Sequence, residues 1–229
     1  MKLFIAKKSV LIIIAVILTV AAVIGICAGA VSAASAHSGE KVIVIDAGHG
    51  GVDAGVKGVK TKTNESDINL SISKYLRGYF ADAGFKVVMT RKTQGGLYGV
   101  STKGFKMRDM KKRKQIIEDN NADMVISVHQ NFCPIPSKRG SHVFFDPSSE
   151  AGKQLAVSVQ NSLNSMQEAV KQNEPLKGDY YMLKCTKSPS VIVECGFLSN
   201  AEDESLLIDE KYQKSVAYAI FKGAVSYYS

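Results

Sequence analysis

The stretch KVIVID (residues 41–46) decides the fold class, because it is a continuous β-branched run that leads directly into glycine-rich sequence. A run of this kind is typical of a strand that is buried on both faces of a parallel sheet. Comparable runs recur along the chain and alternate with segments of helical period. This alternation predicts an α/β fold with a mainly parallel sheet between helix layers.

The other elements are predicted from apolar periodicity and from stop signals. The segment 67–84, for example, carries apolar residues at helical spacing and ends at Gly84. Further helices are predicted over 107–123, 149–167 and, singly or as a pair, 201–228. Strands are predicted over 85–91, 124–129, 141–146, 180–184 and 190–197. The sequence shows no internal repeat or linker, so we expect these elements to form a single domain.

The composition excludes several classes of protein. Of the 229 residues, 45% are apolar and 22% are charged, which is close to ordinary globular usage and excludes a largely disordered chain. Four cysteines are too few for a scaffold built on disulfides. The formal net charge of +8 is basic, and seven lysines and arginines lie in the segment 103–114. We interpret this segment as a solvated helix face, with a contact to an anionic polymer or acidic partner as the alternative.

The amino terminus has the pattern of a targeting segment. Three lysines precede an uncharged, mainly apolar run over residues 10–36, and Ala34-Ser35-Ala36 offers a small-x-small cleavage site. The run is also long enough to span a bilayer as a helix. Residues 1–36 are therefore predicted to be either a signal peptide or a membrane anchor. Under both alternatives we expect the rest of the chain to be exported, and nucleic acid is not an expected partner.

Four residues are candidates for a hydrolytic metal site. His49 and His129 each lie at the end of a predicted strand, where sites form in open α/β sheets, and Glu194 has a third such position. Glu65 lies in the polar stretch before the long helix. Two imidazoles and a carboxylate suit Zn²⁺, and a second carboxylate can then act as general base. Taken singly, each of these histidines and glutamates is also typical of a packed or solvated residue.

The glycine-rich run over residues 48–58 fits no phosphate-binding motif. A dinucleotide fingerprint needs glycine where this chain has Asp53, and Lys57 is misplaced for a P-loop. We interpret the glycines as allowing a sharp turn that presents His49. A thiol nucleophile is a weaker alternative, because neighbouring residues on a strand face opposite sides. If Glu194 faces the site, Cys195 faces the core.

Five motifs occur in an order that resembles the zinc-dependent N-acetylmuramoyl-L-alanine amidases. They are VIVIDAGHGGVDAG (42–55), NESDINL (64–70), FKVVMTR (85–91), ADMVISVHQN (122–131) and VIVECGFLSN (191–200). The resemblance covers residues 41–226, and within the family the chain is most similar to the germination-specific, CwlD-like amidases of spore formers. It implies a zinc amidase catalytic domain with a central mixed, mostly parallel sheet flanked by helices on both faces.

The resemblance also implies roles for individual residues. Zn²⁺ would be bound by His49, Glu65 and His129, and Glu194 would be the catalytic acid and base. Arg113 and Asn131 would support the site. Two stretches depart from the family pattern, residues 132–134 after the second histidine and residues 93–105, and they leave the substrate fit open.

The function implied is hydrolysis of the amide between N-acetylmuramic acid and L-alanine, which removes stem peptides from peptidoglycan. The spore cortex is the expected substrate, on the way to muramic δ-lactam. The expected location is the cell wall or the forespore intermembrane space, with membrane contact only through residues 10–36 if they are not cleaved. Two alternatives remain: a vegetative autolysin for cell separation, and a weakly active amidase or glycan-binding protein that needs an accessory partner.

Overall fold

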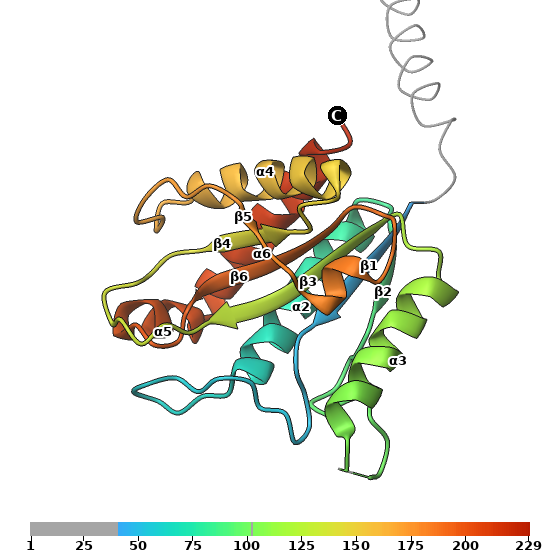
Figure 1. Ribbon diagram of the computed structural model, residues 1–229. Helices are drawn as coiled ribbons and strands as arrows, with labels where there is room; N and C mark the ends of the chain where they lie inside the picture. The colour runs from blue at the N-terminus through green and yellow to red at the C-terminus, as the bar shows by residue number, and fades with distance from the viewer. Residues whose placement is uncertain (1–40, 102) are drawn as a thin grey trace, which may run out of the picture. The chain divides into compact units, whose positions relative to one another are not determined.

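A six-stranded sheet is the centre of the fold. The computed structural model describes residues 41–101 and 103–229, so the predicted signal or anchor segment lies outside the described residues. The strands follow the order β2-β1-β3-β6-β4-β5 across the sheet (Figure 1). Their bounds are β1 Val42–Ala47, β2 Lys86–Met89, β3 Met124–Asn131, β4 His142–Phe145, β5 Leu176–Lys177 and β6 Ser190–Phe197. No helix within the described ranges is long and apolar enough to cross a membrane.

The sheet is mixed and mostly parallel, which confirms the predicted fold class. β1 pairs in parallel with both β2 and β3, and β3 pairs in parallel with β6. Only the pairing of β4 with β6 is antiparallel. Because β1, β3 and β6 run in the same direction, their carboxyl ends meet at one edge of the sheet.

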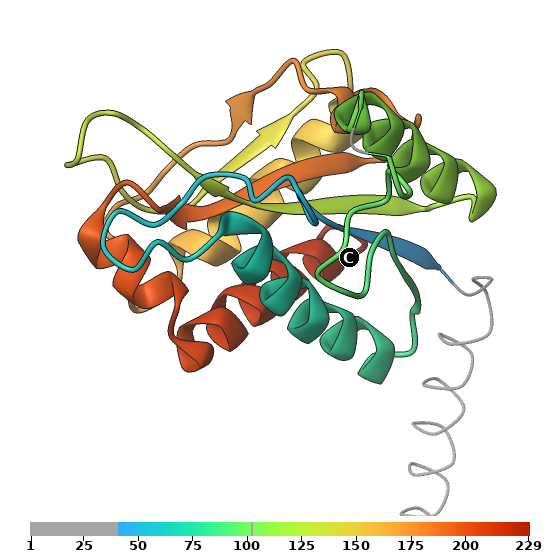
Figure 2. The ribbon, with the colours of Figure 1, turned by 90° about the horizontal axis from the view of Figure 1, so that it is seen from below.

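Helices cover both faces of the sheet. They are α2 Glu65–Asp82, α3 Phe105–Asp119, α4 Glu150–Asn164, α5 Ala201–Leu207 and α6 Glu210–Ser226. Figure 2 shows α2 and α6 on one side of the sheet and α3 on the other. The larger core lies on the side of α2, α4 and α6, where Ile45, Val128 and Val193 are fully buried. The residues that alternate with these along the strands, such as Val44 and Ile192, face the other side of the sheet and pack beneath α3.

One predicted strand is wrong. The segment YYMLK (180–184) is not extended but contains a short 3-10 helix, η1, at Tyr181–Lys184. Its consecutive residues Met182 and Leu183 are both buried against the α3 face of the sheet, which a turn of helix allows and an alternating strand does not. Both neighbouring positions of β6, the next strand along the chain, are taken by β3 and β4, so this segment could not pair with β6. The short strand β5, by contrast, was not predicted.

Two other boundaries matter for the site. The helix α2 begins at Glu65, two residues earlier than predicted, so Glu65 lies in its first turn and not in a preceding loop. The terminal segment forms two helices, because the side chain of Asp209 accepts a hydrogen bond from the backbone N–H of Tyr212 and starts α6 afresh.

Candidate metal centre

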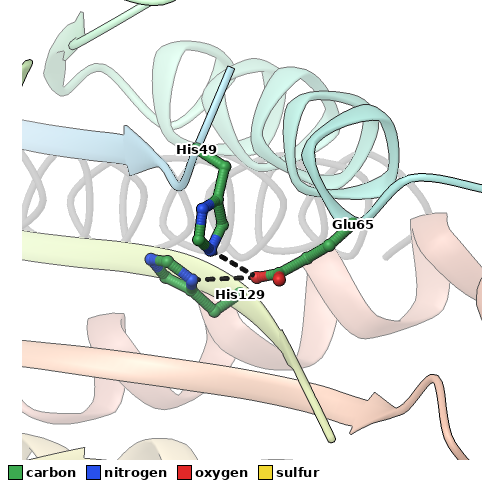
Figure 3. A group of neighbouring side chains, drawn as sticks. All are labelled: His49, Glu65 and His129. Atoms are coloured by element: carbon green, nitrogen blue, oxygen red, sulfur yellow. Dashed lines mark hydrogen bonds and ion pairs between the residues drawn. The ribbon is translucent and has the colours of Figure 1, made fainter. Parts of the chain in front are cut away.

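Three predicted ligands meet at the carboxyl edge of the sheet. Figure 3 shows His49, Glu65 and His129 pointing toward one another, each from a different segment of the chain. The Oε1 atom of Glu65 lies 3.2 Å from Nε2 of His49 and 3.0 Å from Nδ1 of His129. One ligand atom from each residue lies within 4.8 Å of the others. Glu65 and His129, which are 64 positions apart in sequence, thus belong to one compact donor set with His49.

The turn that follows β1 presents His49. Its backbone has a φ of 61°, and Gly50 and Gly51 also have positive φ, which confirms that glycines make this turn possible. The carbonyl oxygen of His49 accepts a hydrogen bond from Nη2 of Arg113 at 2.6 Å. A non-glycine residue in the left-handed region is strained, so this bond and the two glycines hold a conformation that the chain would not favour alone.

Two further glycines let the ligands approach the backbone closely. A Cβ atom on Gly48 would lie 2.3 Å from the ring of His129, and one on Gly55 would lie 2.3 Å from Oε2 of Glu65. Both distances are far below van der Waals contact. The glycine-rich run therefore shapes the pocket for the ligands in addition to turning the chain.

Glu65 is a buried and ionised carboxylate. Its side chain is 3% exposed, and it accepts hydrogen bonds from the backbone N–H groups of Val56 and Gln130 at 2.9 and 3.1 Å. Burial raises its pKa, but His129 and His49 lower it well below the usual range. Its place in the first turn of α2 also favours a negative charge, because the positive end of the helix dipole lies there.

The pKa of His49 is set by the two carboxylates beside its ring. Burial lowers its pKa, but the carboxylates of Asp53 and Glu65 outweigh that effect and raise the pKa to about 9. A cation that binds at Nε2 would displace this proton. Two imidazoles around one buried carboxylate are the donor set that Zn²⁺ prefers, so the residues present fit a zinc ion.

Glu194 lies beside this donor set on β6. It is the register partner of His129 on the neighbouring strand, and the two side chains share the α3 face of the sheet. Burial raises the pKa of Glu194 to about 7. Within the described part of the chain, its Oε2 atom is buried without a hydrogen-bond partner. The next residue, Cys195, is fully buried in the core, as predicted from strand alternation.

A buried ionic network lies beneath the turn. Arg113 is 2% exposed and donates hydrogen bonds to Asp46, Asp109 and two backbone carbonyls, so it lies where support for the site was predicted. Burial raises the pKa of Asp46, but Arg113 and the hydroxyls of Ser127 and Thr90 lower it to about 2. A saturated network of this kind rigidifies the segment that carries His49.

The sequence did not identify two residues of this region. Arg91 is buried and donates to the carbonyls of Ala47 and Gly48, the residues just before His49. Asp53 was noted only for breaking a dinucleotide motif, yet its Oδ2 lies 3.0 Å from Nδ1 of His49. A charged residue at the end of the predicted strand 85–91 and a carboxylate four residues from a histidine were the available signals.

Asn131, also predicted to support the site, lies two positions after His129 on the same strand. It ends β3, and its Oδ1 accepts a hydrogen bond from the backbone N–H of Phe132. Phe132, at the first position that departs from the family pattern, is about half exposed.

A pocket of about 190 Å³ opens over the donor set. Its lining includes His49, His129, Arg113, Tyr180, Tyr181 and Met182. Burial and, to a smaller extent, the charge of Glu194 raise the pKa of Tyr180. In the basic segment 103–114, Arg113 is buried while Lys103, Lys111 and Lys112 are exposed, in agreement with the predicted solvated face.

Comparison with known proteins agrees with this geometry. Residues 43–226 match the family model described as N-acetylmuramoyl-L-alanine amidase (Amidase_3). The chain is 33% identical to the germination-specific N-acetylmuramoyl-L-alanine amidase of Bacillus subtilis (strain 168), over 82% of this chain and 80% of that protein.

Two solved structures are similar as well. The CwlD amidase from Clostridioides difficile, solved in complex with the GerS lipoprotein, superimposes with a TM-score of 0.77 at 35% identity, over 82% of this chain and 98% of that one. The catalytic domain of CwlV, an N-acetylmuramoyl-L-alanine amidase from Bacillus (Paenibacillus) polymyxa var. colistinus, gives a TM-score of 0.73 at 28% identity, over 82% and 98% of the two chains.

Proposed function

We propose a zinc-dependent hydrolysis for this chain, which belongs to the N-acetylmuramoyl-L-alanine amidase family. The activity is cleavage of the amide bond between N-acetylmuramic acid and L-alanine in peptidoglycan. The observation that supports zinc is the buried carboxylate of Glu65 between two imidazoles at 3.0 and 3.2 Å. His49, Glu65 and His129 would hold the ion. When bound, Zn²⁺ supplies the Lewis acidity that polarises a carbonyl and acidifies water.

Glu194 is the proposed catalytic acid and base. Its buried carboxyl group, with a pKa raised to about 7, can be deprotonated when the attacking water gives up a proton. The same carboxyl then returns that proton to the nitrogen of the leaving L-alanine. Its Oε2 atom, which has no hydrogen-bond partner within the described residues, is the atom available for both transfers.

The spore cortex is the proposed substrate. The similarity to the germination-specific amidase of Bacillus subtilis supports this assignment. A vegetative autolysin is the alternative, and deletion of the gene distinguishes the two. Loss of muramic δ-lactam from spore peptidoglycan with normal cell separation supports the cortex, whereas chained vegetative cells support the autolysin.

An accessory protein is proposed as a partner, and action outside the cytoplasm as the setting. The Clostridioides difficile CwlD amidase was solved in complex with a lipoprotein, which supports a partner of similar kind. Affinity capture of the tagged chain from sporulating cells tests this proposal. A single stoichiometric partner that raises the hydrolysis rate supports it, and full activity of the isolated chain contradicts it.

Digestion of purified peptidoglycan, followed by mass spectrometry of the fragments, tests the mechanism. The purified protein should release peptides that begin with L-alanine, and chelation should abolish the release. Glu194→Gln should lose more than about 100-fold in rate, the usual contribution of a general acid or base, and should keep its zinc. Glu118→Gln is a matched control, because Glu118 lies exposed on α3. Unaltered hydrolysis by the Glu194→Gln variant would remove Glu194 from the mechanism.

A further inference from the structure

The two ring nitrogens of His49 face two different carboxylates. Nε2 lies 3.2 Å from Glu65 in the donor set, and Nδ1 lies 3.0 Å from Oδ2 of Asp53 on the opposite side of the ring. The two atoms lie within ion-pair distance, but within the described ranges Nδ1 makes no hydrogen bond of good geometry, to this carboxylate or to any other group. A carboxylate this close to Nδ1 favours one orientation of the ring and, in the neutral form, the tautomer that carries its proton on Nδ1.

Asp53 is itself held in place. Its backbone pairs in both directions with Gly50, with N···O distances of 2.8 and 3.2 Å, which closes the turn over residues 50–53. Its second carboxylate oxygen, Oδ1, accepts a hydrogen bond from the backbone N–H of Gly55 at 3.3 Å. The side chain is 26% exposed, so its contact with His49 is partly shielded from water. The carboxylate therefore has a fixed position from which it can orient the ring.

The two histidines differ in how firmly the surrounding fold fixes the orientation of the ring. His129 lies on β3 between β1 and β6, and its ring fills the space above Gly48. His49 lies on a turn, with a left-handed backbone that only its surroundings maintain. The ring of His49 can rotate about its side-chain torsions unless a second contact prevents it. Asp53 supplies that contact.

We propose that Asp53 is a positioning residue for zinc binding. A small rotation of the ring would let its carboxylate accept the N–H of Nδ1, which would leave the Nε2 lone pair of neutral His49 directed into the donor set. This inference rests on the proposed function, because it assumes that His49 is a zinc ligand. Outer partners of zinc-bound histidines typically contribute about 10–100-fold to metal affinity, and a loss of that size is expected when Asp53 is removed.

Zinc affinity of the purified chain, measured by competition with a chromophoric chelator, tests the proposal. Asp53→Ala should weaken binding by about 10–100-fold, and Asp53→Asn, whose amide oxygen still accepts the N–H, should lose much less. Asp119→Ala is the control, since Asp119 is exposed at the end of α3. Asp53→Ser serves where the alanine variant does not fold, because its hydroxyl keeps a polar group for the turn but is too short to reach Nδ1.

Cobalt substitution separates positioning from direct ligation. The visible absorption of Co²⁺ in the Asp53→Asn variant should match that of the wild type, because the proposed ligands are unchanged. A spectrum that reports a lost ligand would overturn the positioning role, and so would unchanged zinc affinity in both Asp53→Ala and Asp53→Ser. A wild-type chain that binds no zinc would overturn the proposed zinc mechanism, and this inference with it.

Discussion

The substitution Gly48→Ala tests the candidate metal centre separately from the stability of the fold, because it adds a single methyl group beside the ring of His129. The backbone of Gly48 does not have positive φ, so alanine is compatible with its conformation. The added Cβ, however, would lie 2.3 Å from the His129 ring, whereas ordinary contacts begin at 3.4 Å. The ring must therefore move by about 1 Å, whereas plausible metal-ligand distances lie within about 0.2 Å of their standard values.

We expect two consequences of different size. Zinc affinity should fall by more than about 10-fold, since even the loss of an outer partner of a ligand costs that much. Stability without metal should fall by only about 1–3 kcal/mol, the usual cost of one additional methyl group in a packed region. Chelator competition measures the first quantity and urea unfolding in excess chelator the second.

Gly78→Ala is the matched control. Gly78 lies on α2, and a Cβ there would meet nothing within 4 Å. Alanine at this helix position should add up to about 1 kcal/mol of stability and leave zinc affinity unchanged. If Gly48→Ala binds zinc as tightly as the wild type, His129 is not held as described, and its role as a ligand is refuted.

Three further predictions concern the buried framework. Arg113→Ala should cost about 3–5 kcal/mol in urea unfolding, because it leaves buried carboxylates unpaired, whereas the exposed Lys111→Ala should have little effect. The pKa of Asp46 is lowered from 3.8 to about 2, so ionised Asp46 contributes about 2 kcal/mol to the free energy of unfolding. This contribution is present above pH 4 and is lost as the pH falls toward 2. Acid unfolding followed by circular dichroism should show this loss in the wild type and not in Asp46→Asn. Gly223→Ala would place a Cβ 2.5 Å from the backbone of Val159 between α6 and α4, so it should lower the unfolding midpoint while zinc affinity persists.

The order of strands and helices could be predicted because burial leaves a clear pattern in sequence. The run at 41–46 and the run at 190–197 are both buried on two faces, and few other structures accept so many β-branched residues in succession. YYMLK was misread because its mixture of aromatic and aliphatic residues resembles an edge strand. Its packing, in which the consecutive residues Met182 and Leu183 are both buried against the α3 face, distinguishes it as a short helix.

The candidate ligands could be named from the sequence, but most of the groups that hold them could not. His49, His129 and Glu194 follow from their strand-end positions and Glu65 from the polar stretch before the long helix, and the family resemblance then implied the role of each. The roles of Arg91 and Asp53 depend on contacts between side chain and backbone across a turn, and such contacts have no periodic signature. Arg113 was named only through the family resemblance, because its local pattern is that of its exposed lysine neighbours, and the packing of α3 against the turn shows the contact that it makes.

The sequence distance between the ligands has a consequence for the timing of activity. Glu65 and His129 are separated by 64 residues, and they meet only after β1 and β3 have paired in parallel. Parallel pairings between distant segments form slowly, because the conformational entropy of the intervening loop is lost before any contact between the strands stabilises the structure. A newly made chain is therefore expected to be unable to cut peptidoglycan until these strands have paired. The proposed zinc ion would bind only the finished arrangement and would then make that arrangement more persistent.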